Sequence, residues 1–288
     1  MRLDQMIAKM AARLSNDGID TAKLDARLLA RHALGLSDVG LLSGFDRILD
    51  DRDIACLEVL MQRRLKREPV AHILGERDFW GLLFKVTKDT LVPRPDSETL
   101  VAGILDTIND HDASLTILDI GTGSGCLLLS LLSELPNAVG VGADISSPAL
   151  AVAQQNAEAL DLAGRACFVR GHYAEAFSGG IDILISNPPY LAAHEMDDLE
   201  VDVAQYDPAG ALVSGESGLE AYQQIFSSVH EWDRIPGLMA FEFGHAQAQD
   251  VQELAKMTGL VARAGSSGKI LKDLGGRNRV YLLQSMQY

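Results

Sequence analysis

The chain has 288 residues, of which 47% are hydrophobic and 23% charged, a composition typical of folded proteins with a buried core. With 25 Lys and Arg against 40 Asp and Glu, its net charge of −15 argues against a protein that grips a nucleic-acid backbone. No apolar run approaches the about 20 residues that span a bilayer, and residues 1–14 are amphipathic and charged, unlike a signal peptide. We therefore expect a cytoplasmic protein with no membrane partner.

Metal-ligand spacings do not occur in the sequence. Cys56, Cys126 and Cys167 are an odd number of cysteines without CxxC spacing, which argues against a disulfide framework and against a zinc site. The seven histidines include no HxxxH or HExxH pair. We therefore expect no metal cofactor.

The charge is distributed unevenly along the chain. Residues 1–90 contain 15 Lys and Arg and 14 Asp and Glu, whereas residues 91–288 contain 10 and 26. No Lys or Arg occurs between Arg94 and Arg165. The chain thus divides into a near-neutral N-terminal part and a strongly acidic C-terminal part.

Residues 1–69 have the pattern of a small helical domain. Apolar residues recur with a 3.6-residue period over residues 3–14 and predict a first helix. A second helix is predicted to begin at Asp20 or Thr21, and a third over residues 52–67. Four cations lie in the last turn of the third helix: Arg63, Arg64, Lys66 and Arg67. Cations at that position interact favourably with the helix dipole, which accounts for the cluster. The alternative is that the cluster forms a patch that binds a partner.

Residues 70–92 are predicted to form a β-hairpin linker, because apolar and aromatic residues surround two glycines there. From residue 93 to 288 strand and helix patterns alternate, which predicts an α/β fold with a mostly parallel sheet. Helices are predicted at 147–160 and 218–231 among others. The predicted strands are 116–120, 139–143, 166–169, 181–185, 238–243, 260–264 and 280–283.

A glycine-rich loop, Asp119-Ile120-Gly121-Thr122-Gly123-Ser124-Gly125, follows the first of these strands and precedes an apolar helix. Glycines allow a tight turn there, and a helix N-terminus offers free N–H groups. The next strand ends in Asp144, a position from which a carboxylate can hold both ribose hydroxyls of a nucleoside. Asp119 would repel a pyrophosphate and favour a cationic sulfonium. The pattern favours S-adenosylmethionine over NAD, with a turn that binds no ligand as the third interpretation.

A second motif, Asn187-Pro188-Pro189-Tyr190, directly follows an apolar strand. Two consecutive prolines remove two N–H donors, so the carbonyls at this bend are expected to point outward. The Asn187 side-chain oxygen and the Pro188 carbonyl can both accept hydrogen bonds from one planar –NH₂ group, and Tyr190 can pack on its face. Such a site orients a nitrogen conjugated to a carbonyl or an aromatic ring, and it needs no obligatory general base. A proline-rich turn at the strand end is the alternative.

The two motifs together resemble the class I methyltransferases that methylate amino or amide nitrogens. Residues 91–98 (LVPRPDSE) also resemble the PRPDTE segment of the peptide chain release factor N5-glutamine methyltransferases, the PrmC/HemK family. The helical N-terminal part, the hairpin linker and residues 206–208, 215–219 and 273–277 match as well. The resemblance therefore covers essentially the whole chain.

This resemblance implies a class I, Rossmann-like methyltransferase domain with a mostly parallel seven-stranded sheet at residues 93–288. It implies that residues 1–69 recognise the substrate and that residues 70–92 link the two domains. The implied reaction transfers a methyl group from S-adenosylmethionine to the side-chain amide nitrogen (N5) of the glutamine in the GGQ motif of class 1 release factors. S-adenosylhomocysteine is the implied product.

The resemblance also assigns roles to residues. Asn187, Pro188, Pro189 and Tyr190 are predicted to grip the substrate amide, and Arg94 and Glu98 to order the entrance to the site. His172 and Tyr173 stand where the family often has an acidic or small residue followed by Trp, and Tyr173 can stack near the adenine. The predicted cofactor-binding residues are Asp119, Gly121, Thr122, Gly123, Gly125, Asp144, Ile145, His172, Tyr173 and Asn187.

Two other substrate classes remain open. An N5-glutamine methyltransferase of a ribosomal protein is the nearest alternative, and the PRPDSE segment argues against it. A nucleic-acid methyltransferase acting on an exocyclic amine would share the Asn-Pro-Pro-Tyr motif, but a basic groove is expected there and residues 91–288 are acidic. A cofactor-binding module without activity conflicts with the intact motif.

Carboxylates gather directly after the second motif. We hypothesise that they form an acidic collar, which attracts the basic surroundings of a GGQ loop and repels RNA phosphate; a solvated helix face is the alternative. Glu242, after the fifth strand, is predicted to have a structural role or to face the pocket. The collar would consist of Glu195, Asp197, Asp198, Glu200, Asp202 and Asp207.

Overall fold

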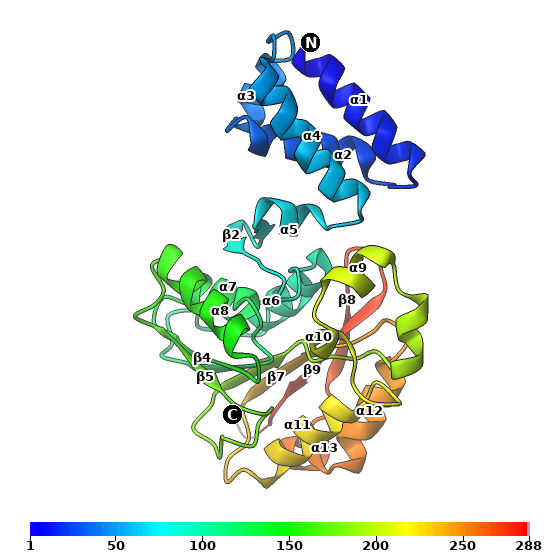
Figure 1. The fold of residues 1–288 in the computed structure, drawn as a ribbon. Coiled ribbons are helices and arrows are strands. Elements are labelled where there is room, and N and C mark those ends of the chain that lie inside the picture. The colour runs from blue at the N-terminus through cyan, green and yellow to red at the C-terminus, as the bar shows by residue number, and fades with distance from the viewer. Residues whose placement is uncertain (287–288) are drawn as a thin grey trace. The chain divides into compact units, whose positions relative to one another are not determined.

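The computed structural model describes residues 1–286 and contains two compact units, whose elements are labelled in Figure 1. The helical unit comprises Met1–Glu76 together with Glu200–Tyr206. The sheet unit comprises Arg77–Leu199 and, of the described residues, 207–286. Within the described residues, no helix is both long and apolar enough to cross a membrane.

The helical unit is formed by short amphipathic helices around one apolar core. The stripe predicted for the first helix is buried, with Leu3 and Met10 fully inaccessible. The third predicted helix begins after Asp50, whose side chain accepts a hydrogen bond from the Asp53 N–H at 2.7 Å. The helices of this unit are α1 (Leu3–Asn16), α2 (Ala22–Ala33), α3 (Asp38–Ser43), α4 (Asp51–Leu65), α5 (Val70–Leu74) and α9 (Val201–Tyr206).

Arg64 of α4 is the polar centre of the helical unit. Its Nε donates to Asp25 Oδ2 of α2 at 2.7 Å, and its Nη1 donates to Asp202 Oδ2 of α9 at 2.6 Å. The Arg64 side chain is only 7% exposed. Next to it, the Tyr206 hydroxyl donates to the Lys66 carbonyl at 2.8 Å. Arg64 therefore holds α9 against α4, although α9 lies far along the chain.

The sheet unit contains a seven-stranded sheet in the order β5-β4-β3-β6-β7-β9-β8. The strands β3 to β7 run parallel, and β9 is antiparallel to both of its neighbours. This order confirms the predicted Rossmann-like class. The strands are β3 (Thr116–Ile120), β4 (Val139–Asp144), β5 (Ala166–Arg170), β6 (Ile183–Ser186), β7 (Leu238–Glu242), β8 (Lys269–Lys272) and β9 (Asn278–Gln284).

Helices cover both faces of this sheet (Figure 1). Ile117 and Ile183 pack with α6 and α7 on one face, whereas Leu118 and Leu184 pack with α11, α12 and α13 on the other. Strands buried on both faces need continuous apolar runs, as in Ile183–Ser186, where every residue is buried. The helices and 3₁₀ turns are η1 (Pro95–Ser97), α6 (Glu98–Leu105), α7 (Cys126–Glu134), α8 (Ser147–Ala159), η2 (Ala193–Asp198), α10 (Ala209–Leu212), α11 (Glu220–Glu231), α12 (Ala248–Met257) and α13 (Leu260–Ala264).

The prediction of a strand at 260–264 was wrong, because these residues form the helix α13. Leu260 and Ala264 are both buried, and their four-residue spacing places them on one helix face. Gly259 and Gly265 bound the turn at positive φ angles of 79° and 68°. The remaining strand is β8, which sequence reasoning missed; it lies at the sheet edge and has lysines at both ends.

The β-hairpin is present as β1 (Glu76–Phe79) and β2 (Leu82–Lys85), and residues 70–74 ahead of it form the helix α5. Asn156 of α8 anchors the hairpin within the sheet unit. Its side chain accepts from the Lys85 N–H at 2.7 Å and donates to the carbonyls of Lys85 and Ser124 at 3.1 and 2.8 Å. Because Asn156 is only 1% exposed, one buried amide supports both the hairpin and the glycine loop.

Replacing Arg64 should destabilise the helical unit strongly. Arg64→Ala leaves the buried Asp25 carboxylate without its cation, a change that costs about 3–5 kcal/mol in the free energy of unfolding. Urea unfolding followed by far-ultraviolet circular dichroism measures this change. The control is Arg31→Ala, which breaks a pair with Asp38, a side chain that is 77% exposed, and should cost at most about 1 kcal/mol. Equal losses in free energy of unfolding in the two variants would show that the buried Arg64 pairs contribute no more to stability than an exposed pair.

Candidate active site

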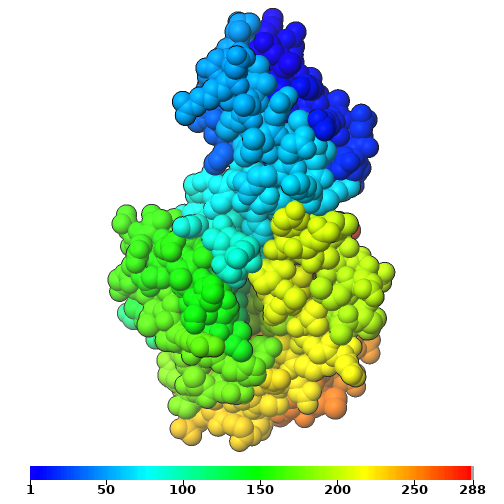
Figure 2. Space-filling view, in the orientation of Figure 1, coloured from blue at the N-terminus to red at the C-terminus, as the bar shows by residue number. Residues whose placement is uncertain are grey.

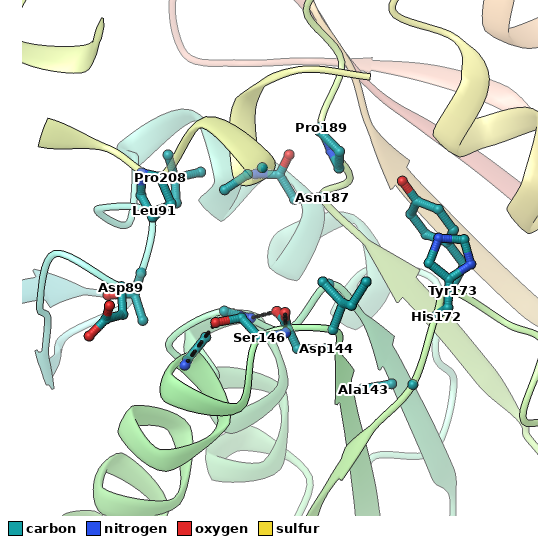
Figure 3. Close-up of a pocket in the computed structure, with 18 residues that line it drawn as sticks. Asp89, Leu91, Ala143, Asp144, Ser146, His172, Tyr173, Asn187, Pro189 and Pro208 are labelled. Carbon is teal, nitrogen blue, oxygen red and sulfur yellow. Dashed lines mark hydrogen bonds between the residues drawn. The ribbon is translucent and has the colours of Figure 1, made fainter. Parts of the chain in front are cut away.

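A cavity of about 360 Å³ lies at the carboxyl ends of β3, β4 and β6 (Figure 3). In the space-filling view, the sheet unit is hollowed between its green segments and the yellow segment that follows the Asn-Pro-Pro-Tyr motif (Figure 2). The cavity wall contains eight of the predicted site residues: Gly121, Gly123, Asp144, Ile145, His172, Tyr173, Asn187 and Pro189. The structure therefore brings the two motifs to one place.

The glycine loop and Asp144 are joined by hydrogen bonds at the cavity wall. Asp144 Oδ2 accepts from the Gly123 N–H at 2.9 Å, and its Oδ1 accepts from the Ser146 N–H at 2.8 Å. The loop reaches Asp144 because Gly121 and Gly123 adopt positive φ angles of 73° and 55°. Each carboxylate oxygen retains a second lone pair for a ligand. The dashed lines in Figure 3 show how these bonds fix the carboxylate.

Asp119 lies beneath the loop and is fully buried. Its Oδ2 accepts a hydrogen bond from the Thr122 hydroxyl at 2.7 Å, whereas its Oδ1 has no hydrogen-bond partner within residues 1–286. Burial, followed by the nearby charge of Asp144, raises the Asp119 pKa to about 7. Neither Asp119 nor Thr122 lines the cavity, and the same is true of Gly125, the residue that caps α7.

The Asn-Pro-Pro-Tyr motif begins directly after β6. Asn187 and Pro189 line the cavity, and Pro188 is buried behind them. The Asn187 Nδ2 donates to the Ser97 hydroxyl at 3.3 Å, so the side chain has a partner on one side. The Tyr190 carbonyl accepts from Gln247 Nε2 at 2.8 Å, and burial raises the pKa of the Tyr190 phenol. Tyr190 is therefore a neutral ring at physiological pH.

His172 and Tyr173 lie together on the cavity wall, with ring centroids 4.5 Å apart at an interplanar angle of 62° (Figure 3). Tyr173 has a positive φ of 47°, which is costly for an aromatic residue and common at functional sites. The His172 Nδ1 lies 3.0 Å from Glu175 Oε1. The Tyr173 ring thus packs against the His172 ring at the cavity wall.

The two residues predicted at the entrance do not line the cavity. Arg94 Nη2 lies 3.6 Å from Asp207 Oδ2, and the Asp207 side chain is only 5% exposed. Glu98 Oε1 accepts from the Trp80 N–H at 3.0 Å and so ties α6 to the hairpin. That Arg94 and Glu98 order the entrance to the site stays a prediction.

Known proteins resemble the chain along almost its entire length. A family model described as the PrmC N-terminal domain matches residues 5–75, and the methyltransferase small domain matches residues 97–206. The release factor glutamine methyltransferase of Rhodospirillum rubrum is 42% identical over 97% of this chain and 84% of its own length. The enzyme of that name from Cereibacter sphaeroides is 39% identical over 97% of both chains. The chain belongs to the release factor glutamine methyltransferase family.

Solved structures support the fold of this family member. The hMettl16 catalytic domain in complex with MAT2A 3′UTR hairpin 6 superposes with a TM-score of 0.57 at 14% identity and covers 78% of this chain and 81% of its own. The same domain with hairpin 1 also gives a TM-score of 0.57, at 16% identity. At this identity the likeness shows a class I methyltransferase fold and nothing about the substrate.

Several cavity residues of this family member escaped sequence reasoning. Asp89, Thr90 and Leu91 reach the cavity from the segment after the hairpin, and Pro208 reaches it from beyond η2 (Figure 3). Leu91 and Pro208 lie within the segments 91–98 and 206–208 that resemble the family, and Asp89 and Thr90 directly precede the first of these segments. The remaining unpredicted wall residues are Ala143, Ser146, Ala149, Gly171, Gly210 and Ala211.

The hypothesis of six carboxylates in a solvent-facing collar was wrong for two of them. Asp202 is paired with Arg64, and the Asp207 side chain is nearly inaccessible. Glu195, Asp197, Asp198 and Glu200 are exposed and remain candidates. Glu195 Oε2 also accepts from the Ala192 N–H at 2.7 Å and so caps η2. The described residues contain no group of three or more His, Cys, Asp or Glu side chains placed to hold a metal ion.

The stability of the protein should depend on pH through Asp119. Its folded-state pKa of about 7 exceeds the ordinary value of 3.8, so the protonated carboxyl stabilises the fold below pH 4 and this contribution is lost as pH rises through 7. Asp119→Asn removes the titration. The Asp119→Asn variant should therefore have a higher free energy of unfolding than the wild type, and the gain should be larger at pH 8.5 than at pH 5. The two gains should differ by about 2–3 kcal/mol, at 1.36 kcal/mol per pKa unit.

Thermal and urea unfolding at the two pH values test this prediction. The control is Ser130→Ala, which alters another buried polar side chain but no titrating group, so its effect should not change with pH. If the effect of Asp119→Asn is the same at both pH values, Asp119 does not titrate as described.

Proposed function

We propose that this protein transfers a methyl group from S-adenosylmethionine to the side-chain amide nitrogen of the glutamine in the GGQ motif of class 1 peptide chain release factors. The observation that carries the proposal is that Asn187 faces the same cavity as the glycine loop and Asp144. The high identity to release factor glutamine methyltransferases over nearly the whole chain supports this substrate class.

The cavity residues fit the adenosyl group of this cofactor. Asp144 and Tyr173 both line the cavity. Asp144 has carboxylate lone pairs for two ribose hydroxyls, and the aromatic ring of Tyr173 can stack on the adenine. An added Cβ at Gly123 would have only the Gly121 carbonyl within 4.0 Å, so the backbone there is open to close approach by a ligand. The Asp144 carboxylate on the cavity wall suits a cationic ligand and opposes a pyrophosphate. When bound, the cofactor supplies an electrophilic methyl group on a positively charged sulfur.

The Asn-Pro-Pro-Tyr motif would hold and orient the substrate amide. The Asn187 Oδ1 and the Pro188 carbonyl accept one hydrogen bond each from the two N–H bonds of the glutamine side chain. These bonds direct the nitrogen lone pair toward the methyl group, and they stabilise the positive charge that develops on nitrogen during the transfer. The neutral Tyr190 ring packs on the amide plane. A general base is not required before the methyl group has moved.

The acidity of the sheet unit favours a protein substrate over a nucleic acid. Residues 91–288 carry 26 acidic and 10 basic side chains, the reverse of what phosphate binding needs. A ribosomal-protein glutamine would fit the same amide site, and the PRPDSE segment favours the release factor. We further propose that residues 1–69 recognise the body of the release factor and that the reaction takes place in the cytoplasm.

One labelling experiment separates these substrates. The protein is incubated with methyl-labelled S-adenosylmethionine and with a release factor, with its GGQ-to-GGA variant, or with total RNA. Label should appear on the release factor alone, and mass spectrometry should place it on the GGQ glutamine. Label on RNA, or undiminished label on the GGA variant, would rule the proposal out.

Asn187→Ala should abolish turnover but preserve cofactor binding. Loss of the amide acceptor removes the orientation of the substrate nitrogen, for which we expect a fall in kcat of at least about 100-fold. Cofactor affinity, measured by calorimetry, should change by less than about threefold, since most of the cofactor site remains. The matched control is Asn137→Ala, an exposed asparagine whose amide donates to the Asp112 carbonyl, which should behave as the wild type. Full activity of Asn187→Ala would contradict the assigned role.

Asp197, Asp198 and Glu200, three of the exposed carboxylates, should assist association with a basic substrate. One triple variant neutralises them (Asp197→Asn, Asp198→Asn, Glu200→Gln), and its KM for the release factor should be higher than that of the wild type at low salt. The difference in KM should shrink as added salt screens the charges. The control removes three exposed charges elsewhere, in Glu231→Gln, Asp250→Asn, Glu253→Gln. An unchanged KM at every salt concentration in the first variant would reject the collar hypothesis.

A further inference from the structure

The Asn187 side chain has two ends of similar size and opposite hydrogen-bonding character. Its oxygen only accepts hydrogen bonds, and its –NH₂ group only donates them. Under the proposed function the oxygen must face the substrate, because an –NH₂ group there would meet the substrate N–H groups donor to donor. A contact behind Asn187 must therefore decide which end faces the cavity.

Ser97 makes that contact. It closes the 3₁₀ turn η1 and is only 3% exposed. The Asn187 Nδ2 donates to its Oγ at 3.3 Å. A serine hydroxyl can donate as well as accept, so Ser97 by itself would tolerate either end of the amide. The direction has to come from a further partner of Ser97.

Glu242, at the end of β7, is that partner. Its carboxyl group lies within hydrogen-bonding reach of the Ser97 side chain, and the residue is only 1% exposed. An ionised carboxylate only accepts, so the single hydroxyl proton of Ser97 goes to Glu242 and Ser97 offers Asn187 only lone pairs. Asn187 must then turn its –NH₂ group toward Ser97. Its oxygen is left to face the cavity.

We propose that Ser97 and Glu242 are positioning residues, which together set the orientation of the Asn187 amide so that its oxygen receives the substrate. This inference rests on the proposed function and deepens it. It also assigns a role to the serine of the PRPDSE segment. It assigns a role as well to the buried carboxyl group of Glu242, whose Oε2 has no hydrogen-bond partner within residues 1–286.

Charged groups from several elements face Glu242. Burial raises its pKa to about 7, while the guanidinium groups of Arg279 and Arg94 favour the ionised form and Asp96 disfavours it. Arg279 is held in place by Asp96 at 2.9 Å. The other titratable side chains that face this carboxyl are Tyr190, Tyr222 and Cys126.

Protonation of Glu242 would reverse the chain of hydrogen bonds. A protonated carboxyl can donate to Ser97, and the Ser97 hydroxyl can then donate to the Asn187 oxygen. The amide would present its –NH₂ group to the cavity and repel the substrate. Turnover should therefore rise as pH increases through about 7, where Glu242 ionises.

The serine is tested by a pair of variants. Ser97→Ala should lower kcat for release factor methylation about tenfold or more, while the dissociation constant for S-adenosylmethionine changes less than about twofold. Ser97→Thr retains the hydroxyl and should recover most of kcat. Wild-type kcat in Ser97→Ala, or an equal loss in both variants, would overturn the proposal.

The carboxyl is tested through the pH profile. Glu242→Gln keeps the shape of the side chain but cannot ionise, so kcat should fall and the rise through pH 7 should disappear. Asp38→Asn removes an exposed carboxyl of the helical unit, whose side chain is 77% exposed, and should keep that rise. A rise that persists in Glu242→Gln would overturn the assignment to Glu242.

A third measurement reads the amide without any substrate. In ¹⁵N-labelled protein the Asn187 side-chain –NH₂ signal, identified by its absence in Asn187→Ala, should exchange slowly with water in the wild type and in Ser97→Thr. It should exchange faster in Ser97→Ala. Equal exchange rates would overturn the proposal even if the enzyme methylates release factors. A wild type that fails to methylate the GGQ glutamine would instead reject the proposed function, and the exchange rates would still decide this inference.

Discussion

The parallel pairing of β3 with β4 on one side and with β6 on the other is the constraint on which the site depends. Parallel strands finish at the same edge of a sheet, so the residues that follow them meet there whatever their distance along the chain. The glycine loop, Asp144 and Asn187 follow these three strands. An antiparallel partner in any of the three positions would send one motif to the opposite edge and separate the glycine loop and Asp144 from Asn187. The buried apolar runs of the strands are therefore as necessary to the chemistry as the polar residues.

Sequence reasoning succeeded where a residue's environment follows from its immediate neighbours. The glycine loop, Asp144 and the Asn-Pro-Pro-Tyr motif each lie directly after a strongly apolar strand, so their place at the sheet edge follows from the strand itself. The run at 260–264 failed because five apolar-rich residues fit one helical turn as well as a strand. The edge strand β8 was missed because its ends are lysines and it is buried only in part.

Contacts between distant segments could not be read from the sequence. Arg64 looked like one of four cations at a helix end, and only its partners in α2 and α9 show that it lies in a core. Ser97 looked like one letter of a motif, and only the folded chain places it between Asn187 and Glu242. In both cases a polar side chain is buried by residues that lie far away in sequence, and local patterns carry no information about such partners.

The attachment of α9 to the helical unit has a consequence for how such a protein can evolve. Residues 200–206 are encoded within the sheet unit, but their buried partners belong to the N-terminal helices. A gene rearrangement that exchanged the first 76 residues for an unrelated segment would leave Asp202 without its arginine. The two units are therefore expected to be inherited together, and changes at positions 25, 64 and 202 to be correlated among descendants.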